Sequence, residues 1–183
     1  ISVITLFPIA SALALSNAIE KTLDIKSELK WPNDITINGK KVAGMLVDAS
    51  LESNKIENMV LGVGINFNVD AKQIEKMLKD TPNFYGVTSL GEQNKTIKPV
   101  LLVQTFLNEL EKICTLLNSK DTRKIIKDWT VKSSTIGQNV ELNTKEGKIK
   151  GKAIKIDHDG ALIISENKKN IRVIEGDITY ISK

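Results

Sequence analysis

An acidic and a basic residue, Asp34 and Lys41, stand close together in the stretch LKWPNDITINGKKVAGMLV. A lysine ammonium is a compact point charge that suits a carboxylate or a phosphate. A carboxylate oxygen is the kind of ligand that Mg²⁺ prefers, so Asp34 is a candidate metal ligand. Each residue also has an ordinary explanation, because an Asp after Pro-Asn commonly forms a turn and a Lys at the end of a hairpin commonly faces water. Taken alone, either residue is weak support for a binding site.

Glycines in strand-like apolar segments add to these two charges. Gly44 follows Lys41 closely, and a residue without a side chain lets a ligand approach the backbone. Gly62 and Gly64 interrupt LGVGINF, where they indicate a bulge, close packing or a ligand lying across the strand. Asn66 ends this segment, and its amide can both donate to and accept from an adenine edge. The Gly-x-Gly pair is not a dinucleotide fingerprint, because no glycine-led helix start follows it.

The single cysteine and the single histidine exclude several kinds of chemistry. Cys114 is the only cysteine, so no internal disulfide can form and a reducing, cytoplasmic setting is expected. It falls on an apolar helical stripe, which predicts a core thiol. His158 lies in the turn-like DHDG, where we expect it to be solvated. One histidine supports neither a His-rich metal site nor a Ser-His-Asp triad. A Walker A phosphate loop is also absent from the sequence.

The charge pattern favours neither a nucleic acid nor a membrane as a partner. The 183 residues carry 26 Lys and Arg against 22 Asp and Glu, a net charge of +4, but the two signs are interspersed. The apolar run Ile4–Leu15 is too short for a membrane span and is interrupted by Pro8 and Ser11. Ile1 stands where an initiator Met would be expected, so we expect the chain to begin within a longer protein.

The elements that position the two charges follow from the residue patterns. PIASALALSNAIEKTL predicts a helix over Pro8–Leu23, with the proline in its first turn. Strand-like segments follow, and Asn38-Gly39 between them is the strongest short signal for a hairpin. We therefore expect Ile35–Ile37 and Lys41–Ala49 to form an antiparallel pair, with Ile56–Asn66 as a third strand.

Alternation along the second of these strands predicts where its side chains point. In a strand, successive side chains face opposite sides. Strict alternation therefore places Lys41 on the face of Ala43 and Met45, and Gly44 on the opposite face.

The remainder of the chain divides into helices and a β-rich end. We expect a short helix over Val69–Leu78, a polar surface loop over Thr81–Pro99, and a long amphipathic helix over Leu102–Leu117. Asp121 should cap a further helix. After Ser133, short β segments separated by polar turns predict a small barrel or partly open sandwich. These patterns predict two domains, 1–133 and 134–183.

Three segments, KWPND at 30–34, GKKVAGMLVDAS at 39–50 and VLGVGINFN at 60–68, together resemble those of biotin protein ligases. Their order and spacing match, and the later helices and β-rich end are similar to the rest of that family. The resemblance covers essentially the whole chain. It implies an α+β fold in which a mixed β-sheet flanked by helices, similar to that of class II aminoacyl-tRNA synthetases, precedes a small SH3-like C-terminal β-barrel.

The resemblance also implies a reaction. Biotin and ATP would form biotinyl-5′-AMP with the help of Mg²⁺, and a lysine of a carrier protein would then take the biotin. The implied partner is the biotin carboxyl-carrier protein of acetyl-CoA carboxylase. Members of the family can pair through their sheets, so a homodimer is a further expectation.

Roles are implied for the positions that match. Lys41 would contact the biotin carboxylate and the α-phosphate, Asp34 would assist Mg²⁺-ATP, and Asn66 would face the adenine. Lys41 and Asp34 are thus the catalytic candidates, and Asp34 is the candidate Mg²⁺ ligand. The implied biotin-binding residues are Lys41, Gly44, Gly62 and Val63, and the implied ATP-binding residues are Asn33, Asp34, Lys41 and Asn66.

Two departures from the family pattern matter. The family's Gly/Arg-rich loop, which closes over biotinyl-AMP, would lie upstream of Ile1, and the only arginines here are Arg123 and Arg172. We therefore expect these 183 residues alone to adenylate biotin poorly. In addition, Ile181 stands where some relatives place an Arg that reaches the nucleotide.

Other functions stay open on the sequence. A biotin-sensing transcriptional repressor would need an N-terminal DNA-binding domain, which the complete reading frame would show. A non-catalytic interaction module would leave KWPND and GKKVAG without a role. A lipoate or octanoyl transferase ranks lower, because its motifs differ from these.

Overall fold

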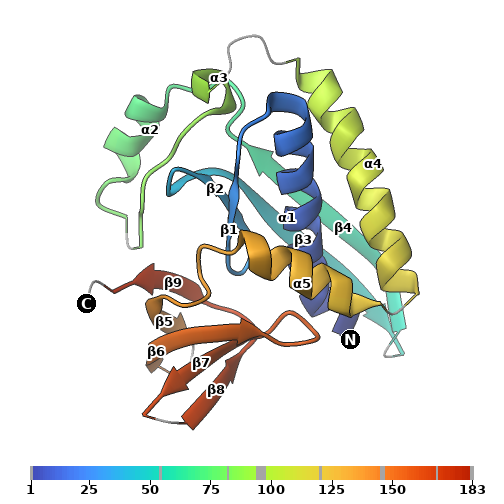
Figure 1. Cartoon of the computed structure of the whole chain (residues 1–183), viewed down its shortest axis with the longest axis vertical. Coiled ribbons are helices and arrows are strands. Elements are labelled where there is room, and N and C mark those ends of the chain that lie inside the picture. Colours follow the sequence, from blue (N-terminus) through green and yellow to red (C-terminus); the bar gives the residue numbers. More distant parts are fainter. Residues whose placement is uncertain are drawn as a thin grey trace.

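A computed structural model of the chain describes residues 2–53, 55–81, 83–93, 98–119, 121–144, 147–167 and 169–181. Helices and one sheet form its first part, and a second sheet forms its last part (Figure 1). The first part contains α1 (Ser2–Leu23), β1 (Glu28–Lys30), β2 (Asp34–Ile37), β3 (Lys40–Glu52), β4 (Lys55–Ile65), α2 (Ala71–Leu78), α3 (Leu90–Gln93), α4 (Pro99–Asn118) and α5 (Thr122–Lys132). The last part contains β5 (Asn139–Thr144), β6 (Gly147–Ile156), β7 (Leu162–Glu166), β8 (Lys169–Val173) and β9 (Asp177–Tyr180).

Helix α1 begins earlier than its sequence predicts. It starts at Ser2, so Pro8 lies inside the helix and not in its first turn. A proline at such a position removes one helix hydrogen bond. The turns around it are nevertheless held, because Leu6 and Ile9 are buried and the Thr5 hydroxyl donates to the carbonyl of residue 159 at 2.8 Å. Tertiary packing overrides the local signal, and the predicted start at Pro8 was wrong.

The first sheet has the strand order β1-β2-β3-β4, and each neighbouring pair is antiparallel. The expected turn at Asn38-Gly39 joins β2 to β3, with φ of 52° and 75° at its two residues. These positive φ values are what a two-residue hairpin needs. The three expected strands are confirmed. Parallel pairing in the described part of the chain is limited to two isolated bridges, Leu29–Ser133 and Lys41–Val87.

Strand β3 does not alternate strictly. Its register with β2 shifts near the start of the strand, which leaves Val42 as an extra residue in a β-bulge. Val42 and Ala43 are therefore both buried, and the side chain of Lys41 lies beside Gly44. The expected placement of Lys41 with Ala43 and Met45, away from Gly44, was wrong. The extra residue places the side chains before it in β3, including that of Lys41, on the face opposite to the one that strict alternation predicts.

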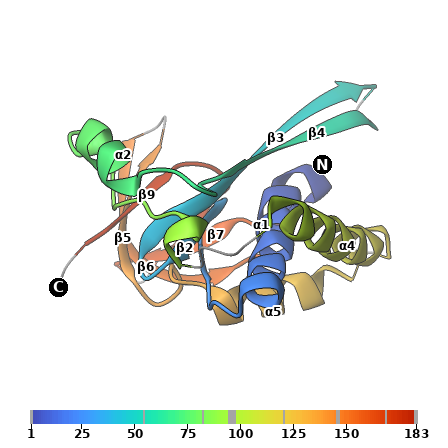
Figure 2. The ribbon, with the colours of Figure 1, turned by 90° about the horizontal axis from the view of Figure 1, so that it is seen from above.

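The core lies between the first sheet and three helices. Helix α1 packs against β3, α4 and α5, and its small residues Ala10, Ala14 and Ala18 are completely buried. Trp129 of α5 is also fully buried. Figure 2 shows α1, α4 and α5 gathered on one side, with the paired strands β3 and β4 extending away from the rest of the molecule. The helices thus cover one face of the sheet, and Lys41 and Gly44 belong to the other.

Helices α2, α4 and α5 agree with expectation, whereas α3 lies within the segment that was expected to be a loop. Asp70 caps α2 by accepting from the Gln73 N–H at 3.1 Å. Asp121 occupies the cap position of α5, although its side chain makes no capping hydrogen bond. Cys114 of α4 packs partly buried against the core, as predicted for a core thiol, and burial raises its pKa. None of the helices described here is both long and apolar enough to cross a membrane.

The segment Thr81–Pro99 is only in part the surface loop that its composition suggests, because its described ends are exposed and its middle is buried. Residues 82 and 94–97 lie outside the described residues, but Val87 to Leu90 are all buried. The Leu90 N–H donates to the Asn66 carbonyl at 2.8 Å, and the Thr88 N–H donates to the Lys41 carbonyl at 2.9 Å. These bonds dock the segment against the start of β3 and the end of β4. The side-chain pattern did not reveal this because the bonds are made by backbone atoms.

The second sheet has the order β8-β7-β6-β5-β9 with antiparallel neighbours, which confirms the expected run of short C-terminal strands. Strands β8 and β9 end this order, so closure into a barrel stays a prediction. Trp31 joins the two parts of the molecule. Its indole N–H donates to the Gly160 carbonyl at 3.0 Å, and its backbone N–H donates to the Thr135 hydroxyl at 3.0 Å.

Candidate functional site

The residues that the sequence singled out line one groove on the face of β3 and β4 opposite the helices. The groove has a volume of about 580 Å³ and draws on three separate stretches of the chain: the turn before β2, strand β3 and strand β4. The structure therefore brings these residues together, while their roles stay predictions. All seven line it: Asn33, Asp34, Lys41, Gly44, Gly62, Val63 and Asn66.

Lys41 and Asp34 form an ion pair in this groove. Nζ of Lys41 lies 2.5 Å from Oδ1 of Asp34. The lysine side chain is 42% exposed, whereas the aspartate side chain is only 16% exposed. An anion that enters the groove therefore meets the ammonium, and the carboxylate stays behind it.

Gly44 makes room for this pair. A Cβ atom at Gly44 would stand 3.0 Å from Oδ1 of Asp34 and 3.1 Å from Nζ of Lys41. Gly62 is different, because a Cβ there would meet only Leu46, at 3.6 Å or more. A side chain at position 44 would therefore crowd both partners of the ion pair, whereas Gly62 leaves its backbone open to the groove.

Asn33 and Asn66 hold the backbone of β3 around the bulge. Nδ2 of Asn33 donates to the Met45 carbonyl, and the Met45 N–H donates back to the Asn33 carbonyl at 3.0 Å. Nδ2 of Asn66 donates to the Lys41 carbonyl at 3.2 Å. Each amide uses one N–H on the scaffold, which leaves its oxygen and its second N–H for a ligand.

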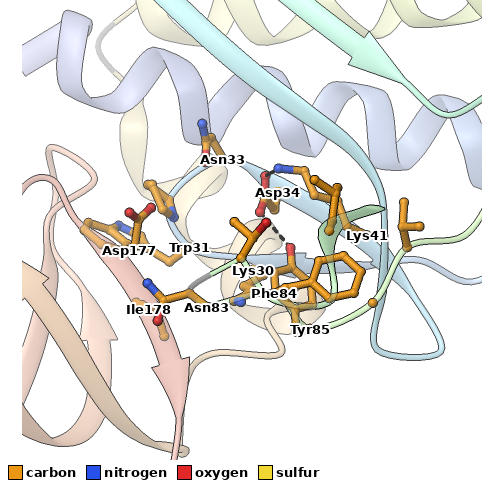
Figure 3. Close-up of a pocket in the computed structure, with 15 residues that line it drawn as sticks. Lys30, Trp31, Asn33, Asp34, Lys41, Asn83, Phe84, Tyr85, Asp177 and Ile178 are labelled. Carbon is orange, nitrogen blue, oxygen red and sulfur yellow. Dashed lines mark hydrogen bonds and ion pairs between the residues drawn. The ribbon is translucent and has the colours of Figure 1, made fainter. Parts of the chain in front are cut away.

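A second cavity, about 280 Å³ in volume, adjoins the groove and reaches the second sheet (Figure 3). Asp34 and Lys41 line both cavities. The other walls of the second cavity include Lys30, Tyr85 and Asp177. Sequence reasoning missed Tyr85 and Asp177 because only tertiary folding brings them near Asp34, whereas Lys30 is the partner of Asp34 in the β1–β2 strand pair. The one available signal was the position of Lys30 within KWPND.

Lys30 is the buried cation of this second cavity. It is 5% exposed, and its Nζ lies 3.2 Å from the centroid of the Tyr85 ring and 5.1 Å from that of Tyr180. An aromatic face attracts a cation, most strongly where water is excluded. Burial lowers the pKa of Lys30 to about 8. The charge of Asp34 opposes this shift and that of Lys41 adds to it.

The low pKa of Lys30 predicts a pH-dependent stability. Because the pKa is about 8 in the folded chain and 10.5 for an ordinary lysine, the unfolded state binds more protons between these values. The cost of burying the charge is fully present below pH 8 and is relieved as the pH rises. We expect the free energy of unfolding of the wild type, relative to Lys30→Met, to rise between pH 8 and 10 by up to about 1.4 kcal/mol per pH unit.

Urea unfolding at a series of pH values measures this difference. The exposed Lys127 provides the control, since Lys127→Met should follow the wild type across the whole range. A constant difference between the wild type and Lys30→Met from pH 7 to 10 would contradict the prediction.

Asp34 is suited to a cation that arrives with a nucleotide. Among the described residues it is the one acidic side chain that lines the groove. Mg²⁺ usually binds through one or two carboxylates together with substrate phosphates, so one aspartate beside a phosphate site fits it. Another acidic cluster, Asp157, His158 and Asp159, lies far along the chain, where Arg172 pairs with both carboxylates. His158 there is exposed, as predicted.

Two family models match the chain. One, described as the biotin/lipoate A/B protein ligase family, matches residues 2–66. The other, described as the biotin protein ligase C terminal domain, matches residues 135–179. Together they cover more than half of the chain.

Individual relatives agree with these matches. The bifunctional ligase/repressor BirA of Bacillus subtilis is 31% identical over 169 residues, which make up 92% of this chain and 50% of that protein. The biotin--[acetyl-CoA-carboxylase] ligase of Paracoccus denitrificans is 27% identical over 84% of this chain and 64% of that protein. The chain thus spans about half to two thirds of the length of these relatives.

A solved structure shows the same fold. The biotin protein ligase from Aquifex aeolicus in complex with biotin and ATP has a TM-score of 0.77 at 23% identity, over 98% of this chain and 72% of that one. This similarity confirms the expected α+β fold. With the two family matches and the order of the three motif segments, it leads to one assignment: the chain belongs to the biotin protein ligase family.

Proposed function

We propose that the protein containing this chain joins biotin to a lysine of a biotin carrier protein, in an ATP-dependent reaction that passes through biotinyl-5′-AMP. The observation that carries the proposal is the ion pair of Lys41 and Asp34, which lines two adjoining cavities on a strand pair with exposed glycine backbone. Family membership and the names of the relatives supply the class of substrate.

The first half of the reaction brings two anions together, so neutralising their charge is the chief electrostatic task. A carboxylate oxygen of biotin attacks the α-phosphorus of ATP. The bond from that phosphorus to the bridging β-phosphate oxygen breaks, and pyrophosphate leaves. We assign the neutralisation of the carboxylate and the α-phosphate to Lys41, since its ammonium is the described cation that lines both cavities.

The other groove residues would orient the two substrates. Asn66 would accept from the adenine amino group, and Asn33 would lie beside the phosphates. Asp34 would hold the Mg²⁺ that accompanies ATP, which supplies positive charge for the departing pyrophosphate. The biotin wall would be the backbone of Gly44, Gly62 and Val63, with Lys41 at its end.

The second half transfers biotin to the carrier. The neutral ε-amine of the acceptor lysine attacks the carbonyl carbon of biotinyl-AMP, loses a proton and displaces AMP. The carrier of acetyl-CoA carboxylase is the proposed partner, in line with the name of the Paracoccus relative. We place the reaction in the cytoplasm, where ATP is available. A homodimer is an expectation from the family resemblance.

The family models help to distinguish the competing functions and to place a domain boundary. Both family models describe ligases and the second is specific to biotin protein ligases, which favours ligation over lipoate transfer and over a non-catalytic module. We also propose a domain boundary between residues 133 and 134. The end of α5 at Lys132 and the start of the second family match at residue 135 support it.

An adenylation assay on the full-length protein tests the function. Incubation with biotin and ATP labelled in the α-phosphate should give labelled biotinyl-AMP, and omission of biotin should abolish it. Addition of a biotin carrier domain should then add one biotin to that domain, and replacement of its acceptor lysine should prevent this. Failure to form biotinyl-AMP, or a preference for lipoate over biotin, would refute the proposal.

A further inference from the structure

Two donors hold the Asp34 carboxylate, one on each oxygen. Nζ of Lys41 lies 2.5 Å from Oδ1, and the Tyr85 hydroxyl donates to Oδ2 at 2.6 Å (Figure 3). A lysine that turns to a substrate anion gives up its contact with Oδ1. Tyr85 is then the described side chain that continues to hold the carboxylate.

The segment that carries Tyr85 is fixed on both sides. Towards the second sheet, the amide oxygen of Asn83 accepts a hydrogen bond from the Thr179 hydroxyl of β9. Towards the first sheet, the Lys41 N–H donates to the Gly86 carbonyl at 3.1 Å. Gly86 has a φ of +97°, a backbone conformation that favours glycine. The segment around Tyr85 is therefore tied to the second sheet by the Asn83 side chain and to the first sheet by the Gly86 carbonyl.

The ring and the hydroxyl of Tyr85 are also held. The Lys30 ammonium lies 3.2 Å from the ring centroid, which pairs a buried cation with the aromatic face. Burial, and then the negative charge of Asp34, raise the pKa of Tyr85, so its hydroxyl keeps its proton and remains a donor. The geometry and the protonation state thus favour the same hydrogen bond.

We propose that Tyr85 is a positioning residue of this site: its hydroxyl fixes the Asp34 carboxylate for the Mg²⁺-bound phosphates while Lys41 neutralises the reacting anions. The inference rests on the proposed function, because it concerns the same substrates. Tyr85 acts on the nucleotide through Asp34. Its effect should therefore depend on the presence of that carboxylate.

Calorimetric binding of Mg²⁺-ATP to the full-length protein measures this effect without turnover. Tyr85→Phe keeps the ring over Lys30 and removes only the hydroxyl. A hydrogen bond to a charged group is worth about a factor of ten or more, so the Kd for Mg²⁺-ATP should rise about 10-fold. The Kd for biotin should change by less than about twofold.

Tyr180→Phe is the matched control. It also keeps a ring near Lys30 and removes a hydroxyl, one that contacts Ser134 and Thr135 and not Asp34. Both Kd values should stay within about twofold of those of the wild type. An equal loss of Mg²⁺-ATP binding in Tyr180→Phe would overturn the specific role of Tyr85.

A double-mutant cycle tests whether Tyr85 acts through Asp34. In the Asp34→Ala background, which removes the acceptor of the Tyr85 hydroxyl, Tyr85→Phe should change the Kd for Mg²⁺-ATP by less than about twofold. A 10-fold change in that background would overturn the proposal, because it would show that the hydroxyl acts on the nucleotide without the carboxylate.

Urea unfolding of the same four proteins needs no ligand. Tyr85→Phe should lower the urea midpoint in the Asp34 background and leave it unchanged in the Asp34→Ala background. Equal shifts in both backgrounds would show that the Tyr85 hydroxyl does not stabilise the protein through Asp34. If the wild type binds neither biotin nor ATP, the proposed function fails and the role of Tyr85 fails with it, and the unfolding cycle still shows whether the contact exists.

Discussion

Replacing Lys41 with alanine should slow the formation of biotinyl-AMP by the full-length protein by about 100-fold or more. That is the size of effect expected when a preorganised electrostatic group is removed from a reacting centre. The ammonium of Lys41 lines both cavities and stands 2.5 Å from Asp34. Its loss removes the positive charge that would offset the biotin carboxylate and the α-phosphate of ATP. Single-turnover formation of biotinyl-AMP from labelled ATP measures the rate.

Lys40→Ala is the matched control for this experiment. Lys40 precedes Lys41 directly, is half exposed and forms a separate ion pair with Glu75 at 2.8 Å. Its removal should change the adenylation rate by less than about twofold, since exposed pairs contribute little. Wild-type adenylation by the Lys41→Ala protein would contradict the role assigned to Lys41.

Replacing Trp31 with alanine should destabilise the protein by about 3–5 kcal/mol, the range for removing a large buried aromatic side chain. Trp31 is 1% exposed, and its indole N–H donates to the Gly160 carbonyl at 3.0 Å. The substitution thus opens a cavity and removes a hydrogen bond between the first part of the chain and the second sheet. Urea unfolding followed by circular dichroism gives the free energy of unfolding.

Substitution by phenylalanine separates the hydrogen bond from the cavity. Trp31→Phe and Trp129→Phe remove the same atoms from two fully buried indoles. The Trp129 indole N–H has no hydrogen-bond partner in the described part of the chain, whereas that of Trp31 bonds to Gly160. Trp31→Phe should therefore cost about 1–3 kcal/mol more than Trp129→Phe. Equal losses would show that the bond to Gly160 contributes nothing to stability.

The sequence was informative where local signals and tertiary structure agree. Asn-Gly predicted the hairpin because both of its residues adopt positive φ. The seven predicted site residues share one groove because the hairpin and the antiparallel β4 bring their segments side by side. Gly44 was singled out for close approach of a ligand, and the structure adds a second reason in the space it leaves for the ion pair.

The sequence was uninformative where distant packing decides the outcome. Nothing in the polar composition of Thr81–Pro99 indicates that backbone hydrogen bonds bury Val87 and place Tyr85 against Asp34. The start of α1 before Pro8 has a similar cause, because contacts with residues near Gly160 hold its first turns. These features depend on neighbours that are far away in the sequence.

The bulge at Val42 makes the direction of the Lys41 side chain depend on how many residues β3 contains. A one-residue insertion or deletion between the Asn38-Gly39 turn and Gly44 would move the side chains on the turn side of the change to the opposite face of the sheet. It would turn the ammonium from the groove towards the buried face of the sheet, with every residue of the site still present. For this site, the length of the strand is as much a functional constraint as the types of its residues.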